Sequence, residues 1–304
     1  MIVIMWAFFI FYSCAAQSNM QVGNANDIDL GGWSGQTLIA GNDNVCVRSD
    51  FCLFGNFCFG PIEYAVTVLG QGASGTFVLS NGIDEIPMRV YFNNASGTTD
   101  RVELFPGVAL TDQTGAQTRG CSADNGNYSV ELDRADLLNA SAGNYRGVID
   151  YEFENDIREV TTGQWVVDVN LADLVQIIGL DDLGLSSGEG AYLKGGDDFC
   201  VYRNGGVDYS VNVRSGNGGA AGVFILNSGA DAVNYEVFYD DQMGADSNAR
   251  QLSEGNTSGG FTGSGTYSAG CTSQNASIFV RVRADLLMRF GSYSDVLTIE
   301  VVPE

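Results

Sequence analysis

Short runs of alternating apolar and polar residues recur along most of the chain. Val66 and Val68 alternate with polar neighbours, as do Val211 and Val213, and this is the pattern of a strand with one buried face. Glycine is abundant (40) and proline scarce (4), a balance typical of strands joined by tight turns. The runs predict strands at 45–47, 64–69, 75–80, 87–92, 128–132 and 146–153, and again at 199–202, 209–214, 222–226, 234–239, 277–283 and 294–302.

The strand pattern occurs twice. GNDNVCV at 41–47 corresponds to GGDDFCV at 195–201, and each copy later contains the run RADLL. The closing strands also match, since one reads GNYRGVIDYEF and the other GSYSDVLTIEV. A period of about 150 residues is too long for a solenoid repeat and indicates two copies of one whole domain.

The short strands, the turn signals and one distant cysteine pair per copy predict an all-β chain of two tandem immunoglobulin-like β-sandwich domains. The apolar run from Met1 to Tyr12 has the length of a secretory signal and is short for a membrane span. We therefore expect a signal peptide at 1–16, an N-terminal domain at 17–176 and a C-terminal domain at 177–304. The mature protein is expected to be exported and soluble.

Export makes disulfides the default interpretation of the cysteines. Two cysteines of each copy correspond to one another, and two further cysteines occur only in the first copy. A zinc site is a poor alternative, because the chain contains no histidine and no CxxC motif. The predicted bonds are Cys46–Cys121, Cys200–Cys271 and Cys52–Cys58.

The chain is strongly acidic, with 37 Asp and Glu against 14 Lys and Arg and a formal net charge of −23. Such a surface repels phosphate backbones, which argues against nucleic-acid binding. Solubility in a salty or extracellular setting accounts for the charge. Calcium held by acid pairs such as Asp197 and Asp198 is the alternative, but no EF-hand or nonapeptide spacing is present. We expect no metal and no cofactor.

The two copies differ after their closing strands. In the first copy, a further strand pattern follows, in which every second residue is apolar and faces one side. In the second copy only Pro303 and Glu304 remain. We expect the extra strand to complete the first sandwich in cis and the second sandwich to lack its last strand. The alternative is that this strand opens the second domain. Its apolar residues are Trp165, Val167, Val169 and Leu171.

Two apolar loops occur only in the first copy. One reads SDFCLFGNFCFG at 49–60, with a cysteine on each side of a Gly-Asn turn, and the other reads LFPGVAL at 104–110. Soluble proteins rarely keep exposed apolar patches without a purpose, so we expect one contact patch. The alternative is that these side chains plug the end of the first core or cover the domain boundary. The predicted surface-binding residues are Phe51, Leu53, Phe54, Phe57, Phe59, Leu104, Phe105, Val108 and Leu110.

The tracts YSVNVRSGNG, GVFILN and NYEVFYD, with the ending GSYSDVLTIEV, resemble the spore coat protein U domain. This domain is the pilin module of archaic chaperone–usher pili. The resemblance covers the second copy almost entirely and the first more loosely. It implies an incomplete immunoglobulin-like, pilin-type fold whose missing strand comes first from a periplasmic chaperone and then from the next subunit, with an outer-membrane usher as a further partner. Backbone hydrogen bonds give such strand addition its affinity, and side-chain pockets give it specificity.

The segment 17–27 offers only Met20 and Val22 as apolar plugs, so we expect the chain to accept a strand but not to donate one. With two domains, the resemblance implies a non-enzymatic tip adhesin at the cell surface that contacts a hydrophobic surface or a host ligand. The alternative is a structural spore-coat or outer-surface protein built from the same domains. An enzyme is a distant third, because the chain has no histidine base and no nucleophile motif.

Overall fold

The computed structural model describes residues 17–35, 39–53, 57–115, 123–187, 190–218, 222–229, 231–244, 248–287 and 291–304. The predicted signal peptide at 1–16, together with Phe54 and Cys121, lies outside the described residues. The described chain is almost entirely β-strand, and α1 (Arg134–Asn139) is a short helix at the first RADLL run. The all-β prediction is therefore confirmed.

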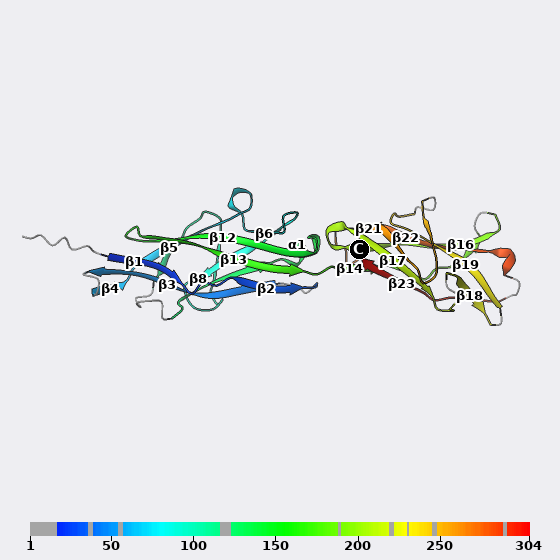
Figure 1. The fold of residues 1–304 in the computed structure, drawn as a ribbon, viewed down its shortest axis with the longest axis horizontal. Coiled ribbons are helices and arrows are strands. Elements are labelled where there is room, and N and C mark those ends of the chain that lie inside the picture. The colour runs from blue at the N-terminus through cyan, green and yellow to red at the C-terminus, as the bar shows by residue number, and fades with distance from the viewer. Residues whose placement is uncertain are drawn as a thin grey trace, which may run out of the picture. The chain divides into compact units, whose positions relative to one another are not determined.

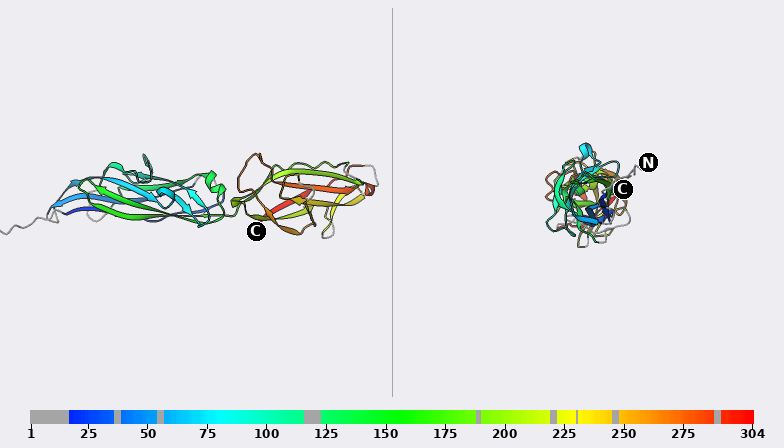
Figure 2. Two further views of the ribbon diagram at one scale, coloured as in Figure 1. Left: turned by 90° about the horizontal axis from the view of Figure 1, so that it is seen from above. Right: turned by 90° about the vertical axis from the view of Figure 1, so that its left-hand side faces the viewer.

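The chain divides into two compact units. The first comprises 1–31, 38–133 and 145–169, and the second comprises 32–37, 134–144 and 170–304. Each unit has two sheets, whose strands run lengthwise along it (Figures 1 and 2). The two predicted immunoglobulin-like sandwiches are thus both present.

The first unit contains a sheet of order β1-β3-β11-β8-β9 with β4 paired to β3, and a sheet of order β10-β5-β12-β13-β2 in which β6 pairs with β12 and β7 with β6. The strands of the former are β1 (Gln17–Gly23), β3 (Ile39–Leu53), β4 (Phe57–Pro61), β8 (Arg89–Asn93), β9 (Val102–Leu104) and β11 (Gly126–Leu132). The strands of the latter are β2 (Ile28–Trp33), β5 (Glu63–Gly70), β6 (Val78–Ser80), β7 (Glu85–Pro87), β10 (Leu110–Thr114), β12 (Gly143–Asn155) and β13 (Val160–Leu171).

The second unit contains a sheet of order β14-β16-β22-β19-β18, with β15 paired to β16 and β20 to β19, and a three-stranded sheet of order β21-β17-β23. Its strands are β14 (Val175–Ile178), β15 (Ser186–Ser187), β16 (Tyr192–Arg203), β17 (Asp208–Ser215), β18 (Phe224–Ser228), β19 (Asp231–Asp240), β20 (Arg250–Leu252), β21 (Thr257–Thr262), β22 (Ala276–Arg283) and β23 (Leu297–Pro303). The sheets change from the first unit to the second between Leu171 and Val175, slightly before the predicted boundary at residue 176.

Both cores follow from the two-residue period of the strands. In the first unit, Trp165 on β13 is 1% exposed and stacks on Tyr128 of β11, with ring centroids 4.2 Å apart. In the second unit, Val211 and Val213 on β17 are fully buried against a core that includes Phe199 and Tyr239. The alternation that predicts the strands therefore also selects the buried residues.

The N-terminal segment of the first unit departs from the prediction. The sequence analysis predicts no strand in the segment 17–27, but Gln17–Gly23 forms β1 and pairs antiparallel with β3 from Cys52 to Cys46. An edge strand is held mainly by backbone hydrogen bonds, so it needs few apolar residues. Met20 and Val22 therefore belong to a strand that is already paired within its own unit.

Candidate functional site

The closing strands of the two units, β12 and β23, hold equivalent positions. β12 pairs with β5, where Asn155 lies opposite Tyr64, and β23 pairs with β17, where Pro303 lies opposite Tyr209. Because Tyr64 and Tyr209 open the matching tracts of the two copies, this register aligns the closing strands residue by residue. The aligned pairs are Ile149 with Leu297, Tyr151 with Ile299, and Phe153 with Val301.

The outer edges of these two strands differ. β12 is covered by β13, and β13 in turn is covered by β2 (Figure 1). β23 ends its three-stranded sheet, and within the described residues it pairs only with β17. An uncovered edge presents a row of backbone N–H and C=O groups that can pair with another strand.

The inward faces of the two closing strands also differ in burial. Ile149 and Phe153 are fully buried at 0% exposure, and Tyr151 between them is partly exposed. Leu297, Ile299 and Val301 contact the second core but remain partly exposed. The apolar face of β23 therefore lacks the cover that β13 gives to β12.

Two adjoining cavities lie along the uncovered edge of β23, with volumes of about 330 Å³ and about 410 Å³. Leu183, Asp295 and Leu297 line both cavities, so the two form one continuous groove. Aliphatic side chains from several strands contribute to the groove lining, which suits alternate apolar side chains of an extended strand. Further apolar lining residues are Leu180, Ile278 and Ile299 in the smaller cavity and Leu185, Leu226, Val280 and Val282 in the larger.

Asp295 holds one wall of the groove in place. Its carboxylate accepts hydrogen bonds from the Ser215 and Tyr235 hydroxyls, each at 2.7 Å. It also accepts from the backbone N–H groups of Asn217, at 3.1 Å, and Val296, at 2.8 Å. Burial, reinforced by the hydrogen bond to Asp295, raises the pKa of Tyr235 well above its usual range, so this hydroxyl remains a donor.

The opposite wall of the groove is formed by the segment 181–185, which corresponds to the start of β2 in the first unit. The Asn26 N–H donates to the Asp43 carboxylate at 2.7 Å, and the Asp181 N–H donates to the Asp197 carboxylate at 2.7 Å. In the first unit the chain then enters β2, beside β13, whereas in the second it enters β15 and pairs with β16. Backbone N–H and C=O groups need hydrogen-bond partners. Because no described strand lies beside β23, the segment of β15 finds these partners at the edge of β16 instead.

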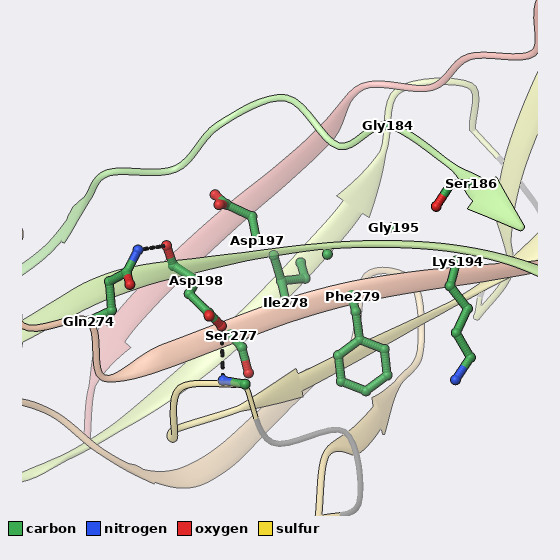
Figure 3. Close-up of a pocket in the computed structure, with 12 residues that line it drawn as sticks. Gly184, Ser186, Lys194, Gly195, Asp197, Asp198, Gln274, Ser277, Ile278 and Phe279 are labelled. Carbon is green, nitrogen blue, oxygen red and sulfur yellow. Dashed lines mark hydrogen bonds between the residues drawn. The ribbon is translucent and has the colours of Figure 1, made fainter. Parts of the chain in front are cut away.

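A third cavity, of about 660 Å³, borders β15, β16 and β22. Lys194, Asp198 and Phe279 point to the same side of the sheet there (Figure 3). The Asp198 carboxylate accepts from the Gly244 N–H at 3.0 Å, and the Gln274 amide donates to the Asp198 carbonyl at 2.7 Å. These polar groups are thus engaged in hydrogen bonds that close the fold around the cavity.

The acid pairs considered as calcium ligands do not gather into a site in the described part of the chain. Across the residues that the structure describes, no group of three or more acidic or thiol side chains is placed to hold a metal ion. Asp197, for example, already accepts the N–H of Asp181. No helix among the same residues is long and apolar enough to cross a membrane.

The apolar segment 49–60 forms a hairpin of β3 and β4. Cys52 lies directly opposite Cys58, and Phe51 opposite Phe59. The register therefore places the two cysteines directly across from each other on neighbouring strands, and the Cys52–Cys58 bond stays a prediction. Phe51 is partly exposed, whereas the side chains of Leu53, Phe57 and Phe59 lie outside the described atoms.

This hairpin is part of a three-stranded ribbon, because β1 pairs with the other edge of β3. The pairing of β3 with β11 stops where Val45 meets Gly126. At about 3.3 Å per residue, the stretch from Val45 to Leu53 extends roughly 26 Å. β1 thus supports a hairpin that projects past the end of β11, a role that the sequence analysis missed.

The second apolar loop is a tight turn on the flank of the first unit. The Val108 N–H donates to the Phe105 carbonyl at 3.0 Å, and the Gly107 N–H donates to the Val68 carbonyl at 2.8 Å. Gly107 has φ +71°, a left-handed conformation that favours glycine. Phe105 and Val108 are each 57% exposed, and Leu69 beside them is 46% exposed. The turn is therefore ordered and presents apolar side chains.

The expectation that Leu104 belongs to the contact surface is wrong. Leu104 is only 3% exposed, because β9 pairs with β8 and turns this side chain into the core, whereas Leu110 remains partly exposed opposite Val66. The loop also lies apart from the hairpin. The pairings of β9 with β8, β8 with β11 and β11 with β3 place Leu104 at the same height in the sheet as Gly41 of β3. The stretch from Gly41 to Phe51 spans roughly 33 Å at about 3.3 Å per residue.

The bonding state of the cysteines is established for two of the predicted disulfides. Cys200 and Cys271 form a bond that closes a sequence separation of 71 residues. Cys46 is also disulfide-bonded, and its predicted partner Cys121 lies outside the described residues. Each unit therefore carries a disulfide at the same point of its first long strand.

The groove-lining residues Leu183 and Leu185 were not identified by the sequence analysis. A signal was present, because DDLGL at 181–185 aligns with NDIDL at 26–30. Each run is too short to be recognised as equivalent to the other from the sequence alone. The structure shows the equivalence, because each run donates a backbone N–H to the matching aspartate, Asp43 in the first unit and Asp197 in the second. The extra strand was identified, and the structure places Trp165, Val167, Val169 and Leu171 on β13 with their side chains buried.

These features define a class of domain: an immunoglobulin-like sandwich that is complete in the first unit and open to a further strand in the second. The family model of the Spore Coat Protein U domain matches residues 199–300. This range runs from Phe199 in β16 to Glu300 in β23. Residues 199–300 are therefore similar to the Spore Coat Protein U domain family. Among curated proteins, the chain has no match.

Several solved structures are similar to the chain. One is the CsuC-CsuE chaperone–tip adhesion subunit pre-assembly complex from archaic chaperone-usher Csu pili of Acinetobacter baumannii, with 11% identity, coverage of 90% of this chain and 99% of that chain, and a TM-score of 0.41. The CupB6 tip adhesin from Pseudomonas aeruginosa has 10% identity, coverage of 95% and 93%, and a TM-score of 0.34. CfaE, the adhesive subunit of CFA/I fimbria of enterotoxigenic Escherichia coli, has 11% identity, coverage of 86% and 74%, and a TM-score of 0.38.

Proposed function

We propose that the chain is a non-enzymatic tip adhesin. Its second unit docks to a fibre by accepting a strand from the next subunit, and its first unit contacts the target. The observation that carries this proposal is the difference between the two closing strands: β13 covers β12, while the edge of β23 is uncovered among the described residues. The Spore Coat Protein U match of the same unit supports it.

The occupant of the groove is an extended strand with apolar residues at alternate positions. β13 shows what fills the equivalent place, since Trp165, Val167 and Val169 face the core and Asp168 between them forms an ion pair with Arg146 at 3.1 Å. Strand addition of this kind combines backbone pairing with side-chain pockets. A periplasmic chaperone supplies the strand first, and the next subunit replaces it at the usher.

The position at the tip follows from how the N-terminal strand is used. A subunit within a fibre must give a strand to its neighbour, but β1 (Gln17–Gly23) is paired with β3 inside the first unit. A chain that accepts a strand and keeps its own N-terminal strand ends the fibre. We therefore place the protein at the cell surface, after export through the periplasm.

The contact surface is the hairpin of β3 and β4, with the turn at 105–108 as a second apolar contact. The turn presents exposed apolar side chains and the hairpin has an apolar sequence, and both backbones are held by hydrogen bonds, which lowers the entropy lost on contact. The expected target is a hydrophobic surface or an apolar region of a host ligand. The two contacts lie apart along the unit, so they meet an extended surface rather than one small ligand.

A synthetic peptide with the sequence of β13, Val160–Leu171, tests the strand-accepting groove. We expect it to bind the full chain one to one, with a Kd of about 1 μM, equivalent to about 8 kcal/mol. Isothermal titration calorimetry gives the affinity and the stoichiometry. The control peptide carries serine in place of Trp165, Val167 and Val169 and should not bind. If the first peptide also fails to bind a chain whose second unit is folded by circular dichroism, strand acceptance is wrong.

The turn at 105–108, called the flank turn below, provides a test of the contact surface. Replacing Phe105 and Val108 with serine is expected to weaken retention on a hydrophobic surface about tenfold, because each buries only part of an apolar side chain worth about 1.5–3 kcal/mol. Retention is measured as the fraction of full-length protein held on polystyrene over a concentration series. Ile83→Ser is the matched control, since Ile83 is 88% exposed in a different turn. Equal losses in both variants would show that the turn has no special role.

A further inference from the structure

In the first unit, β13 lies beside the closing strand β12. Its register shows which residue of a further strand would lie opposite each residue of a closing strand. The Gln164 amide donates to the Asp150 carboxylate at 2.8 Å, and Arg146 pairs with Asp168 across the same two strands at 3.1 Å. These pairs place Trp165 opposite Ile149. Ile149 aligns with Leu297, so a strand added in the same register has its Trp165 equivalent opposite Leu297.

In the first unit, three aromatic rings surround Trp165. Tyr128 stacks on it at 4.2 Å, Tyr151 lies at 4.9 Å and Phe153 at 6.2 Å between ring centroids. Trp165 is 1% exposed. In the first unit, the large side chain at this position of β13 is therefore the centre of a packed aromatic cluster.

The second unit replaces all three rings with smaller aliphatic side chains. Tyr128 lies opposite Asp43, and Ile278 lies opposite the equivalent Asp197, so Ile278 takes the place of Tyr128. Ile299 and Val301 take the places of Tyr151 and Phe153. The second unit therefore has less side-chain volume around this point than the first.

The missing volume coincides with a cavity. The cavity of about 330 Å³ is lined by Ile278, Leu297 and Ile299, the residues that would surround the Trp165 equivalent. Protein cores are close-packed, and an apolar void that remains after a strand is added lowers the stability of the complex. A small side chain at this position would leave most of the cavity empty.

We propose that the strand accepted by the second unit carries a large aromatic side chain opposite Leu297, and that this side chain anchors the strand and sets its register. The inference rests on the proposed strand-accepting function and adds the chemistry of the partner. Buried aromatic residues that fill a pocket dominate many interfaces. A one-residue slip would turn the aromatic side chain to the outer face, so the cavity also selects the register.

A peptide series tests the proposal. The peptides have the sequence Val160–Leu171 with Trp, Phe, Leu or Ala at position 165, and their affinities for the full chain are measured by calorimetry. We expect Trp and Phe to bind most tightly and Ala to bind about 100-fold or more weakly than Trp. The control is Val167→Ala in the Trp peptide, which removes less side-chain volume and should cost less than about tenfold.

The outcomes separate this inference from the function on which it rests. If no peptide binds, strand acceptance and the anchor are both wrong. If all four bind within about threefold of one another, or if Ala binds most tightly, strand acceptance stands and the anchor is wrong. An Ile278→Phe chain adds a reciprocal test, because a ring in the cavity should weaken the Trp peptide about tenfold and spare the Ala peptide. The peptide series decides the question even if that chain does not fold.

Discussion

Replacing Trp165 with alanine is expected to lower the free energy of unfolding of the first unit by about 3–5 kcal/mol, the usual cost of removing a large aromatic side chain from a core. Trp165 is 1% exposed and stacks on Tyr128. It is also the main apolar side chain by which β13 closes the sandwich. The loss should appear as a lower urea midpoint for unfolding of the first unit. This unfolding is measured by hydrogen exchange and mass spectrometry on peptides from β5 and β12.

The matched control is Thr162→Ala, an exposed position on the same strand, which should change stability by less than about 0.5 kcal/mol. The second unit supplies an internal control, because the exchange of β17 and β22 should be unchanged in both variants. If Trp165→Ala leaves the first unit as stable as before, β13 is not the strand that completes it. The division between a completed and an open unit would then lose its basis.

Removing the Cys200–Cys271 disulfide is expected to destabilise the second unit by about 4 kcal/mol in the chain-entropy model, because the bond closes a sequence separation of 71 residues. The effect should be severe, since the sheet β21-β17-β23 has an uncovered edge and a partly exposed inner face. We expect the Cys200→Ser, Cys271→Ser chain to show a much lower urea midpoint for β17 and β22 by hydrogen exchange.

The control for this variant is a chain with Cys52 and Cys58 replaced by serine. These positions belong to the first unit, so the second unit should keep its midpoint. The β13 peptide provides a second comparison: if it binds the groove, it should raise the midpoint of the disulfide-free unit by mass action. An unchanged midpoint without the disulfide would mean that the open sheet is more stable than its exposed inner face implies.

Local patterns were sufficient to identify the strands with strong alternation. Trp165 to Leu171 could be assigned as a strand because side-chain orientation in a strand repeats every two residues, and this period is visible in the sequence. The duplication allowed Cys200 to be matched with Cys46 and the closing strands to be matched with each other. β1 and β2 were not assigned, because backbone pairing with β3 and β13 holds them and leaves only a weak apolar signal.

The fate of single apolar residues was less predictable. Leu104 and Phe105 are neighbours in one apolar run, yet one is 3% exposed and the other 57% exposed. The end of β9 and the turn at Gly107 decide which side chain faces the core. Likewise, the hairpin and the flank turn are both apolar loops of the first copy, but the register of β8, β11 and β3 places them far apart along the unit.

By itself, the sequence determined the all-β composition, the two copies and the presence of one extra strand, because these follow from residue periodicity and from comparing one copy with the other. Tertiary structure alone decided which sheet edge is covered, since that depends on pairing between segments distant in sequence. It also decided the shape of the groove, because the volume around Ile278, Leu297 and Ile299 depends on side chains from separate strands that meet only after folding.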